Sequence, residues 1–190
     1  INLTKAVIPD NITSLPNNLF YECSSLKEVN IPNGVTSIGS SIFYACSTLE
    51  EIVLPNSITS IGNSAFGNCP QLQNFDLPTN LTTIEATTFF NCSSLTEINI
   101  PSSVTSIKNG AFAGCNSLSE LTIPEGVTSL PNIAFYNCSS LTTVNFPSTL
   151  TTIGETAFGN CFSLTTFDVP NTITSISKQA FFQCTSLATV

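Results

Sequence analysis

The 190-residue chain contains no histidine, methionine or tryptophan, and its four basic residues are all lysines. Without histidine it lacks the commonest general base and the commonest metal ligand, so we expect no enzyme, no catalytic residue, no metal site and no cofactor. A net charge of −8 without arginine argues against nucleic acid as a partner, because phosphates require a basic surface. No apolar run approaches the roughly 18 residues that span a bilayer, so no membrane span is expected.

Two residue types recur at intervals of 23 from one end of the chain to the other. The prolines of this series are Pro9, Pro32, Pro55, Pro78, Pro101, Pro124, Pro147 and Pro170. The cysteines, which all belong to the series, are Cys23, Cys46, Cys69, Cys92, Cys115, Cys138, Cys161 and Cys184. A fixed period of this length is typical of solenoids, in which stacked units share one core.

Positions within the repeat are counted from the residue before each proline, so that Ile31 is position 1 and Pro32 is position 2. Position 13 is always Phe, position 19 always Leu and position 6 always Thr. Apolar residues fill positions 1, 5, 8, 12, 13, 16, 19 and 22, apart from Thr88 at position 12. We therefore predict a solenoid of about eight 23-residue repeats, with these columns facing inward.

Short elements are expected within each unit. The alternation L-x-x-I-x-I at positions 19 to 1 predicts a short strand that ends at the proline, and identical strands in successive units form a parallel sheet. The β-branched V-T-S-I segment predicts a second short strand. The spacing A-F-x-x-C fits one inward-facing turn of helix.

The unit L-x-x-I-x-I-P-x-x-V-T-S-I-G-x-x-A-F-x-x-C resembles the BspA-type leucine-rich repeat of bacterial and protist surface proteins over the whole chain. The resemblance implies a leucine-rich-repeat solenoid with a parallel β-sheet on its concave face and short helical turns and short strands on the outer side. It also implies a secreted or cell-surface protein that acts in adhesion or protein binding, and it carries no catalytic residue across. Position 9, usually Gly, departs from the pattern at Pro16, Glu85, Lys108, Pro131 and Ser177.

The repeats run through a single domain over residues 1–190, in which 1–7 form the tail of a preceding repeat. We interpret the chain as a fragment of a longer array. The alternative function is structural, with subunits stacking head to tail into a filament or surface layer. The end layers expected to meet contain Ile8, Leu15, Phe20 and Leu26 on one side and Ile176, Phe181, Leu187 and Val190 on the other.

Position 21, which points outward from the predicted sheet, is the candidate binding face. It contains Glu28, Glu51, Asn74, Glu97, Glu120, Thr143, Thr166 and Thr189. Adjacent carboxylates about 5 Å apart repel each other by roughly 0.8 kcal/mol even in water, which favours a cationic partner or a divalent ion. The alternative interpretation is a solvated face that resists aggregation.

Two further columns are candidate contact or modification sites. The aromatic column at position 14 contains Tyr21, Tyr44, Phe90, Tyr136 and Phe182, which either contact protein or sugar or lie flat and shield the backbone. N-glycosylation sequons occur at Asn2, Asn11, Asn80, Asn91 and Asn137, and some sequons arise by chance in a sequence rich in Asn, Ser and Thr.

The cysteine column is predicted to consist of reduced, buried thiols, because neighbouring Cβ atoms about 5 Å apart do not suit a disulfide. The leading hypothesis is a non-enzymatic surface module that binds a protein or carbohydrate. A third hypothesis, ice binding by the Thr-Ser pairs at positions 6 and 7, is weaker because adjacent strand residues face opposite ways.

Overall fold

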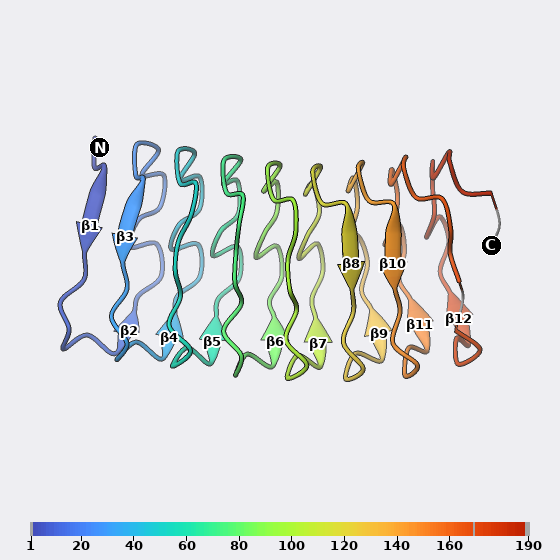
Figure 1. Cartoon of the computed structure of the whole chain (residues 1–190), viewed down its shortest axis with the longest axis horizontal. Helices are drawn as coiled ribbons and strands as arrows, with labels where there is room; N and C mark the ends of the chain where they lie inside the picture. Colours follow the sequence, from blue (N-terminus) through green and yellow to red (C-terminus); the bar gives the residue numbers. More distant parts are fainter. Residues whose placement is uncertain (1, 169, 189–190) are drawn as a thin grey trace.

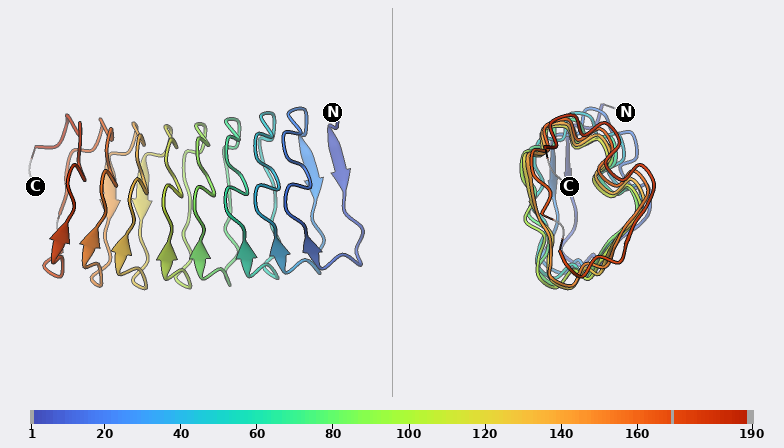
Figure 2. Two further views of the ribbon diagram at one scale, coloured as in Figure 1. Left: turned by 180° about the vertical axis from the view of Figure 1, so that it is seen from behind. Right: turned by 90° about the vertical axis from the view of Figure 1, so that its right-hand side faces the viewer.

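Each 23-residue unit forms one coil of a solenoid, and the coils stack in a row along the long axis of the molecule (Figures 1 and 2). The architecture comes from a computed structural model, which describes residues 2–168 and 170–188. The strand pairs are parallel and join residues 23 apart, such as Ala6 with Val29 and Ile38 with Ile61. This offset keeps every side-chain column in register along the axis, as the sequence period predicted.

Two rows of short strands run along the solenoid, and both predicted strands of the repeat are confirmed. Positions 21–23 form the first row, which consists of β1 (Lys5–Val7), β3 (Glu28–Asn30), β8 (Glu120–Thr122) and β10 (Thr143–Asn145). Positions 7 and 8 form the second row, which consists of β2 (Ser14–Leu15), β4 (Ser37–Ile38), β5 (Ser60–Ile61), β6 (Thr83–Ile84), β7 (Ser106–Ile107), β9 (Ser129–Leu130), β11 (Thr152–Ile153) and β12 (Ser175–Ile176). Figure 1 shows the two rows as separate series of arrows.

The first row is regular only in part of its length. The pairs β1–β3 and β8–β10 are separated by coils in which parallel pairing is reduced to two isolated bridges, Glu51–Asn74 and Asp76–Asn99. The central coils are therefore joined less tightly on this side.

The segment at positions 12–16 is a series of tight turns, and the single helical turn expected there is not found. Positions 11 and 15 have positive φ in all eight coils, for example 52° at Ser41 and 58° at Ala45. Left-handed residues interrupt a right-handed helix, so the segment closes short bonds such as Cys46 N to Phe43 O, 3.1 Å. Other backbone amides of this segment donate to carbonyl oxygens of the next coil, such as Phe43 N to Ala65 O at 2.8 Å. The described part of the chain has no helix long and apolar enough to cross a membrane.

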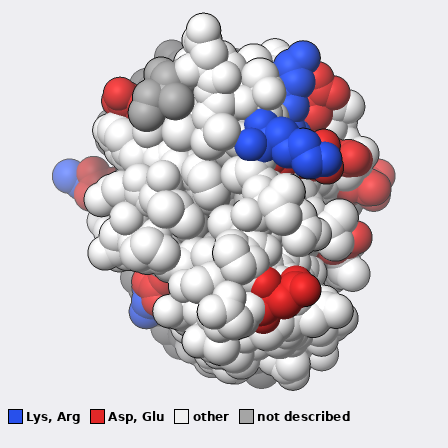
Figure 3. All heavy atoms as spheres, turned by 90° about the vertical axis from the view of Figure 1, so that its left-hand side faces the viewer, with Lys and Arg blue, Asp and Glu red and all other residues white. Residues whose placement is uncertain are grey.

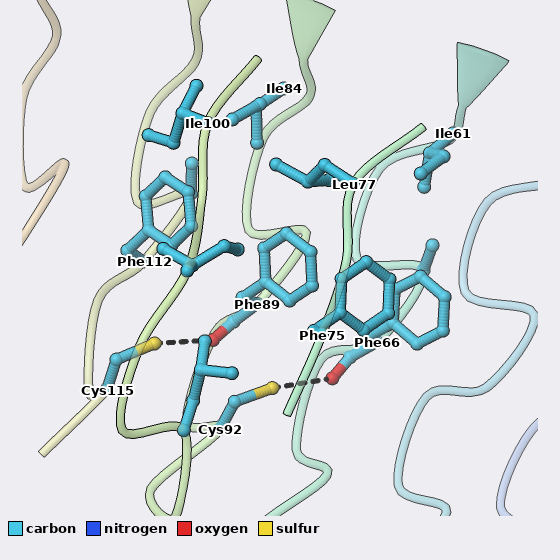
Figure 4. Close-up of a cluster of buried hydrophobic side chains, with 14 of the residues drawn as sticks. Ile61, Phe66, Phe75, Leu77, Ile84, Phe89, Cys92, Ile100, Phe112 and Cys115 are labelled. Atoms are coloured by element: carbon cyan, nitrogen blue, oxygen red, sulfur yellow. Dashed lines mark hydrogen bonds between the residues drawn. The ribbon is translucent and has the colours of Figure 1, made fainter. Parts of the chain in front are cut away.

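Eight phenylalanine rings at position 13 stack along the axis, with the centroids of neighbouring rings 5.3–5.7 Å apart. Phe75, from the sheet side of the coil, packs edge-on between Phe66 and Phe89 at 4.7 and 4.8 Å (Figure 4). Truncating a buried Phe to Ala costs about 3–5 kcal/mol, so this column is a major part of the free energy of folding.

The cysteine at position 16 donates its thiol to the carbonyl oxygen of the phenylalanine in the preceding coil. Figure 4 shows this bond from Cys92 to Phe66 at 3.1 Å and from Cys115 to Phe89 at 3.3 Å. The cysteines are free thiols, as predicted, and all are buried except Cys184, which is half-buried. Burial raises the pKa of Cys92 and Cys138 to about 12, so these thiols stay protonated and donate at neutral pH.

The two ends of the solenoid differ, which corrects the expected pair of end layers. Ile8, Leu15, Phe20 and Leu26 are buried rather than exposed. Leu3 and Ala6 pack against the core at this end, so residues 2–7 help to cover the first coil. At the other end Ile176 is 43% exposed, whereas Phe181 and Leu187 are partly buried. Val190 lies outside the described residues.

Candidate binding surface

The outward side chains of the first strand row form a surface that we call the sheet face, made of positions 20, 21 and 23. The alternation within each strand produces it, since Glu28 and Asn30 of β3 point to solvent while Val29 between them is buried. The predicted position-21 residues all lie on this face and are exposed, namely Glu28, Glu51, Asn74, Glu97, Glu120, Thr143 and Thr166. Thr189 lies outside the described residues.

Negative charge gathers on the sheet face. Seven of the chain's twelve acidic residues occupy its positions, namely Glu28, Glu50, Glu51, Asp76, Glu97, Glu120 and Asp168. Lys5 donates to Glu28 at 2.7 Å at one end of the column. Viewed from the N-terminal end, acidic and lysine atoms lie side by side along one edge of the molecule (Figure 3). Because Glu28 is paired with Lys5, the sheet-face carboxylates without a lysine partner among the described residues start in the second coil, with Glu50 and Glu51.

The sheet face is hollowed where its strands are least regular. One hollow of about 580 Å³ is lined by side chains of three coils, including Asn74, Asp76, Glu97, Asn99 and Glu120. A second, of about 510 Å³, is lined by Lys27, Glu28, Glu50 and Glu51, among others. Carboxylates line both hollows, with Lys27 beside those of the second, so a cationic side chain that enters either one lies near more than one carboxylate.

Apolar and neutral side chains complete the sheet face. Val53, at position 23 of the second coil, is 82% exposed and lies next to the carboxylates. Towards the C-terminus the face is neutral, with Thr143 and Thr166 at position 21. The predicted column is thus divided along the axis into an acidic part and a threonine part, and both are accessible.

The aromatic column at position 14 lies on the outer turn and packs largely against its own neighbours. From Tyr44 onwards, aromatic and small residues alternate from coil to coil, in the order Tyr44, Gly67, Phe90, Ala113, Tyr136, Gly159 and Phe182. A Cβ atom on Gly67 would lie 2.9 Å from Tyr44 Cδ2, so the ring lies across the glycine of the next coil. Tyr21 stacks on Tyr44 instead, with centroids 5.2 Å apart.

The residue after each glycine completes the arrangement. Asn68 donates to the hydroxyl oxygen of Tyr44 at 2.6 Å, and Asn160 donates to that of Tyr136 at 2.9 Å. Phe90 has no hydroxyl, and the corresponding residue after Ala113 is a glycine rather than an asparagine. These contacts favour the shielding interpretation for Tyr44 and Tyr136, whereas Tyr21 and Phe182 remain 44% and 43% exposed.

A family profile described as the BspA type Leucine rich repeat region, six copies long, matches residues 1–119 and 105–190. The chain belongs to the BspA-type leucine-rich repeat family. This confirms the resemblance seen in the repeat itself. No curated protein matches the chain.

Solved structures of other leucine-rich repeat proteins share the fold. The T. pallidum leucine-rich repeat protein TpLRR is 30% identical with a TM-score of 0.80, over 86% of this chain and 78% of that one. A leucine-rich cell surface protein of Faecalibacterium prausnitzii A2-165 is 32% identical with a TM-score of 0.66, over 99% of this chain but only 47% of that one. The pneumococcal vaccine antigen PcpA, 19% identical with a TM-score of 0.53, shows the fold alone.

The repeat consensus of this BspA-type chain did not predict the residues that support the aromatic column. Gly67 and Gly159 accept the tyrosine rings, and Asn68 and Asn160 bind the hydroxyls. In the sequence, a Gly-Asn pair follows each of these tyrosines one repeat later. A consensus of single repeats does not contain this relation, because it compares residues at one position and not residues of neighbouring coils.

Proposed function

We propose that this BspA-type solenoid is a non-enzymatic adhesion or protein-binding module that engages a cationic segment of a partner protein through its sheet face. The observation that carries the proposal is the coincidence of exposed carboxylates with the hollows over the first to fifth coils. Like charges that neighbour one another destabilise the free protein slightly, and a cationic side chain between them removes that repulsion. Opposite potentials also increase the rate of encounter.

The division of the sheet face suggests how the partner lies. Basic side chains are expected over Asp76, Glu97 and Glu120, whereas uncharged polar groups face Thr143 and Thr166. Val53 offers an apolar contact at the edge of the acidic part. A partner oriented in this way uses several coils at once, which is how a solenoid of short repeats builds a large interface.

The test uses synthetic peptides of matched length that carry lysine, glutamate or only uncharged residues at alternate positions. We expect the 190-residue protein to bind the lysine peptide preferentially, with an affinity that falls as salt is added. An exposed charge pair contributes about 0.2–1 kcal/mol, so the triple variant Asp76→Asn, Glu97→Gln and Glu120→Gln should bind about tenfold more weakly.

The matched control is the triple variant Asp10→Asn, Glu22→Gln and Glu85→Gln, which removes the same charge at positions outside the sheet face. It should bind the lysine peptide nearly as well as the unmodified chain. Equal losses of affinity in both variants would mean that only the net charge of the protein matters. Binding of glycans that does not depend on salt would favour a carbohydrate partner instead.

A secreted or cell-surface location is part of the proposal. Its support is the family together with the F. prausnitzii cell surface protein, which is 32% identical over almost all of this chain. Brief protease treatment of intact source cells should remove the protein from them. Full protection until the cells are lysed would contradict a surface location.

A further inference from the structure

Four of the five sequons belong to two columns of the solenoid, and the fold treats these columns differently. Asn11 and Asn80 occupy position 4, two residues after the repeated proline, and both are exposed. Asn91, which is exposed, and Asn137, which is half-buried, occupy position 15, at the end of the outer turn. Asn2 stands outside both columns.

The position-15 asparagines are part of the structure of the outer turn. Asn91 has a φ of 56° and its amide donates to Asn68 Oδ1 at 2.9 Å, so that it extends the chain of bonds that begins at the Tyr44 hydroxyl. Its Oδ1 lies so close to Gly114 that a Cβ there would be only 2.2 Å away. Although the Asn91 side chain is exposed, its amide is therefore held by contacts with the coils on both sides.

Asn137 is held in a similar way. Its φ is 61°, and its amide is 3.2 Å from that of Asn116. The hydroxyls that complete these two sequons are also engaged, since Ser93 donates to Pro70 O at 3.4 Å and Ser139 to Asn116 O at 3.3 Å.

Position 4 leaves its asparagines accessible. The neighbours of Asn80 in the adjoining coils are Ser57 and Ser103, whose hydroxyls turn back to main-chain carbonyls at 2.6 and 2.7 Å. Gly34 is the corresponding neighbour of Asn11 and has no side chain. Other threonines of position 6 donate their hydroxyls to the preceding coil, as Thr36 does to Thr13 O at 3.2 Å, whereas among the described residues the Thr13 and Thr82 hydroxyls, which complete these sequons, form no such bond.

We propose that Asn11 and Asn80 are N-glycosylation sites and that the folded solenoid excludes the sequons at Asn91 and Asn137. In the transfer, Nδ2 of the asparagine bonds to the anomeric carbon of a lipid-diphosphate-linked oligosaccharide. The bond from that carbon to the phosphate oxygen breaks, the lipid diphosphate leaves, and one Nδ2 proton passes to a base of the transferase. Asn80 uses one amide hydrogen for its bond to Asn56 O at 3.0 Å, so the other is available for replacement.

The test separates protection by the fold from the intrinsic quality of each sequon. The folded 190-residue protein and its proteolytic peptides are incubated in parallel with a purified oligosaccharyltransferase and a lipid-linked oligosaccharide, and occupancy at each asparagine is measured by mass spectrometry. We expect all four sequons to be modified in the peptides, but only Asn11 and Asn80 in the folded protein. Thr13→Ala and Thr82→Ala should each abolish modification at the corresponding asparagine alone.

Modification of Asn91 or Asn137 in the folded protein to the level seen in the peptides would overturn the proposal. So would a folded protein in which Asn11 and Asn80 stay unmodified while their peptides react. If the position-15 peptides fail to react even when unfolded, protection is not due to the fold, and the proposal is wrong for that column.

Discussion

Ile133 is the residue whose side chain suits its backbone conformation least. It occupies position 11 and has a φ of 52°. The residues at position 11 of the two adjacent coils are Gly110 and Thr156. A left-handed conformation costs an L-residue about 1–2 kcal/mol, and branching at Cβ adds to the crowding. The conformation persists because cross-coil bonds impose it, including Ile133 N to Glu155 O at 3.0 Å.

Replacing Ile133 with Asn should stabilise the protein by about 1 kcal/mol, because Asn tolerates the left-handed region and Ile133 is already 39% exposed. The free energy of unfolding in urea measures the change. Ile133→Val is the control, since it keeps the branched Cβ and should bring no gain. An Asn variant that is less stable than the Val variant would show that packing outweighs backbone strain here.

The thiols make stability depend on pH on the alkaline side. Burial raises the folded-state pKa of Cys46, Cys92 and Cys138 to about 12, above the ordinary value of 9.0. A raised pKa means that the folded state holds the proton more tightly, so this contribution to stability is complete below pH 9. It is lost as the pH rises from there towards 12.

We therefore expect the free energy of unfolding in urea to fall steadily above pH 9, by about 1.4 kcal/mol per pH unit for each thiol that ionises only on unfolding. Cys92→Ala should reduce this slope, although it lowers stability at neutral pH. Thiol labelling at pH 8 supplies a second measurement, in which Cys184 reacts in the folded protein and the other seven thiols react only in denaturant. A chain with no reactive thiol after denaturation would show disulfides and contradict the assignment.

At the scale of the element, the outer turn depends on relations between coils. The repeat consensus predicted which residues of this turn face inward, and Phe43 and Cys46 are fully buried as expected. It did not predict the left-handed backbone at positions 11 and 15, because residues as different as Asn18, Gly110 and Ile133 share position 11. Cross-coil hydrogen bonds select that conformation, and no local sequence signal records them.

Gly67→Ala tests the packing of the aromatic column. The added Cβ would lie 2.9 Å from Tyr44 Cδ2, so the ring must move, and its hydroxyl would then lose the 2.6 Å bond from Asn68. We expect a loss of about 1–3 kcal/mol in the free energy of unfolding. In a background that carries Tyr44→Ala, the substitution Gly67→Ala should lower the free energy of unfolding much less.

Gly34→Ala is the matched control for this experiment. Its Cβ would be 3.6 Å from the nearest atoms and its φ is not positive, so alanine fits without displacement. Alanine at such a site stabilises a protein by about 0.4–1 kcal/mol through the unfolded chain. If both alanine variants changed stability equally, contact with the tyrosine ring would not be the cause.

For the whole molecule, the 23-residue period predicted the solenoid, and the alternation L-x-x-I-x-I within the unit predicted the parallel strands and their outward side chains. Two features depend on three-dimensional detail and could not be predicted. The hollows on the sheet face arise where strand pairing is reduced to bridges such as Glu51–Asn74. The burial of Ile8 and Phe20 arises because the first coil is covered, whereas a repeat pattern treats every coil as equivalent.

These end contacts decide the association state that we expect of the 190-residue chain. Among the described residues, the large apolar side chains exposed near the ends are chiefly Val7, Leu19 and Tyr21 on one side and Ile176 and Phe182 on the other. Burying the exposed half of each contributes about 1 kcal/mol, and association costs about 4–15 kcal/mol in lost freedom of motion. The terminal strands β1 and β12 have only three and two residues and offer short edges for pairing.

We therefore predict a monomer of 20.2 kDa in light scattering, even when the protein is concentrated. The variant Ile176→Asp with Phe182→Asp should have the same mass, because neither side chain holds copies together. Long polymers of the unmodified chain that disappear in this variant would contradict the prediction. They would also restore head-to-tail stacking, since two ends that meet through different surfaces form open filaments.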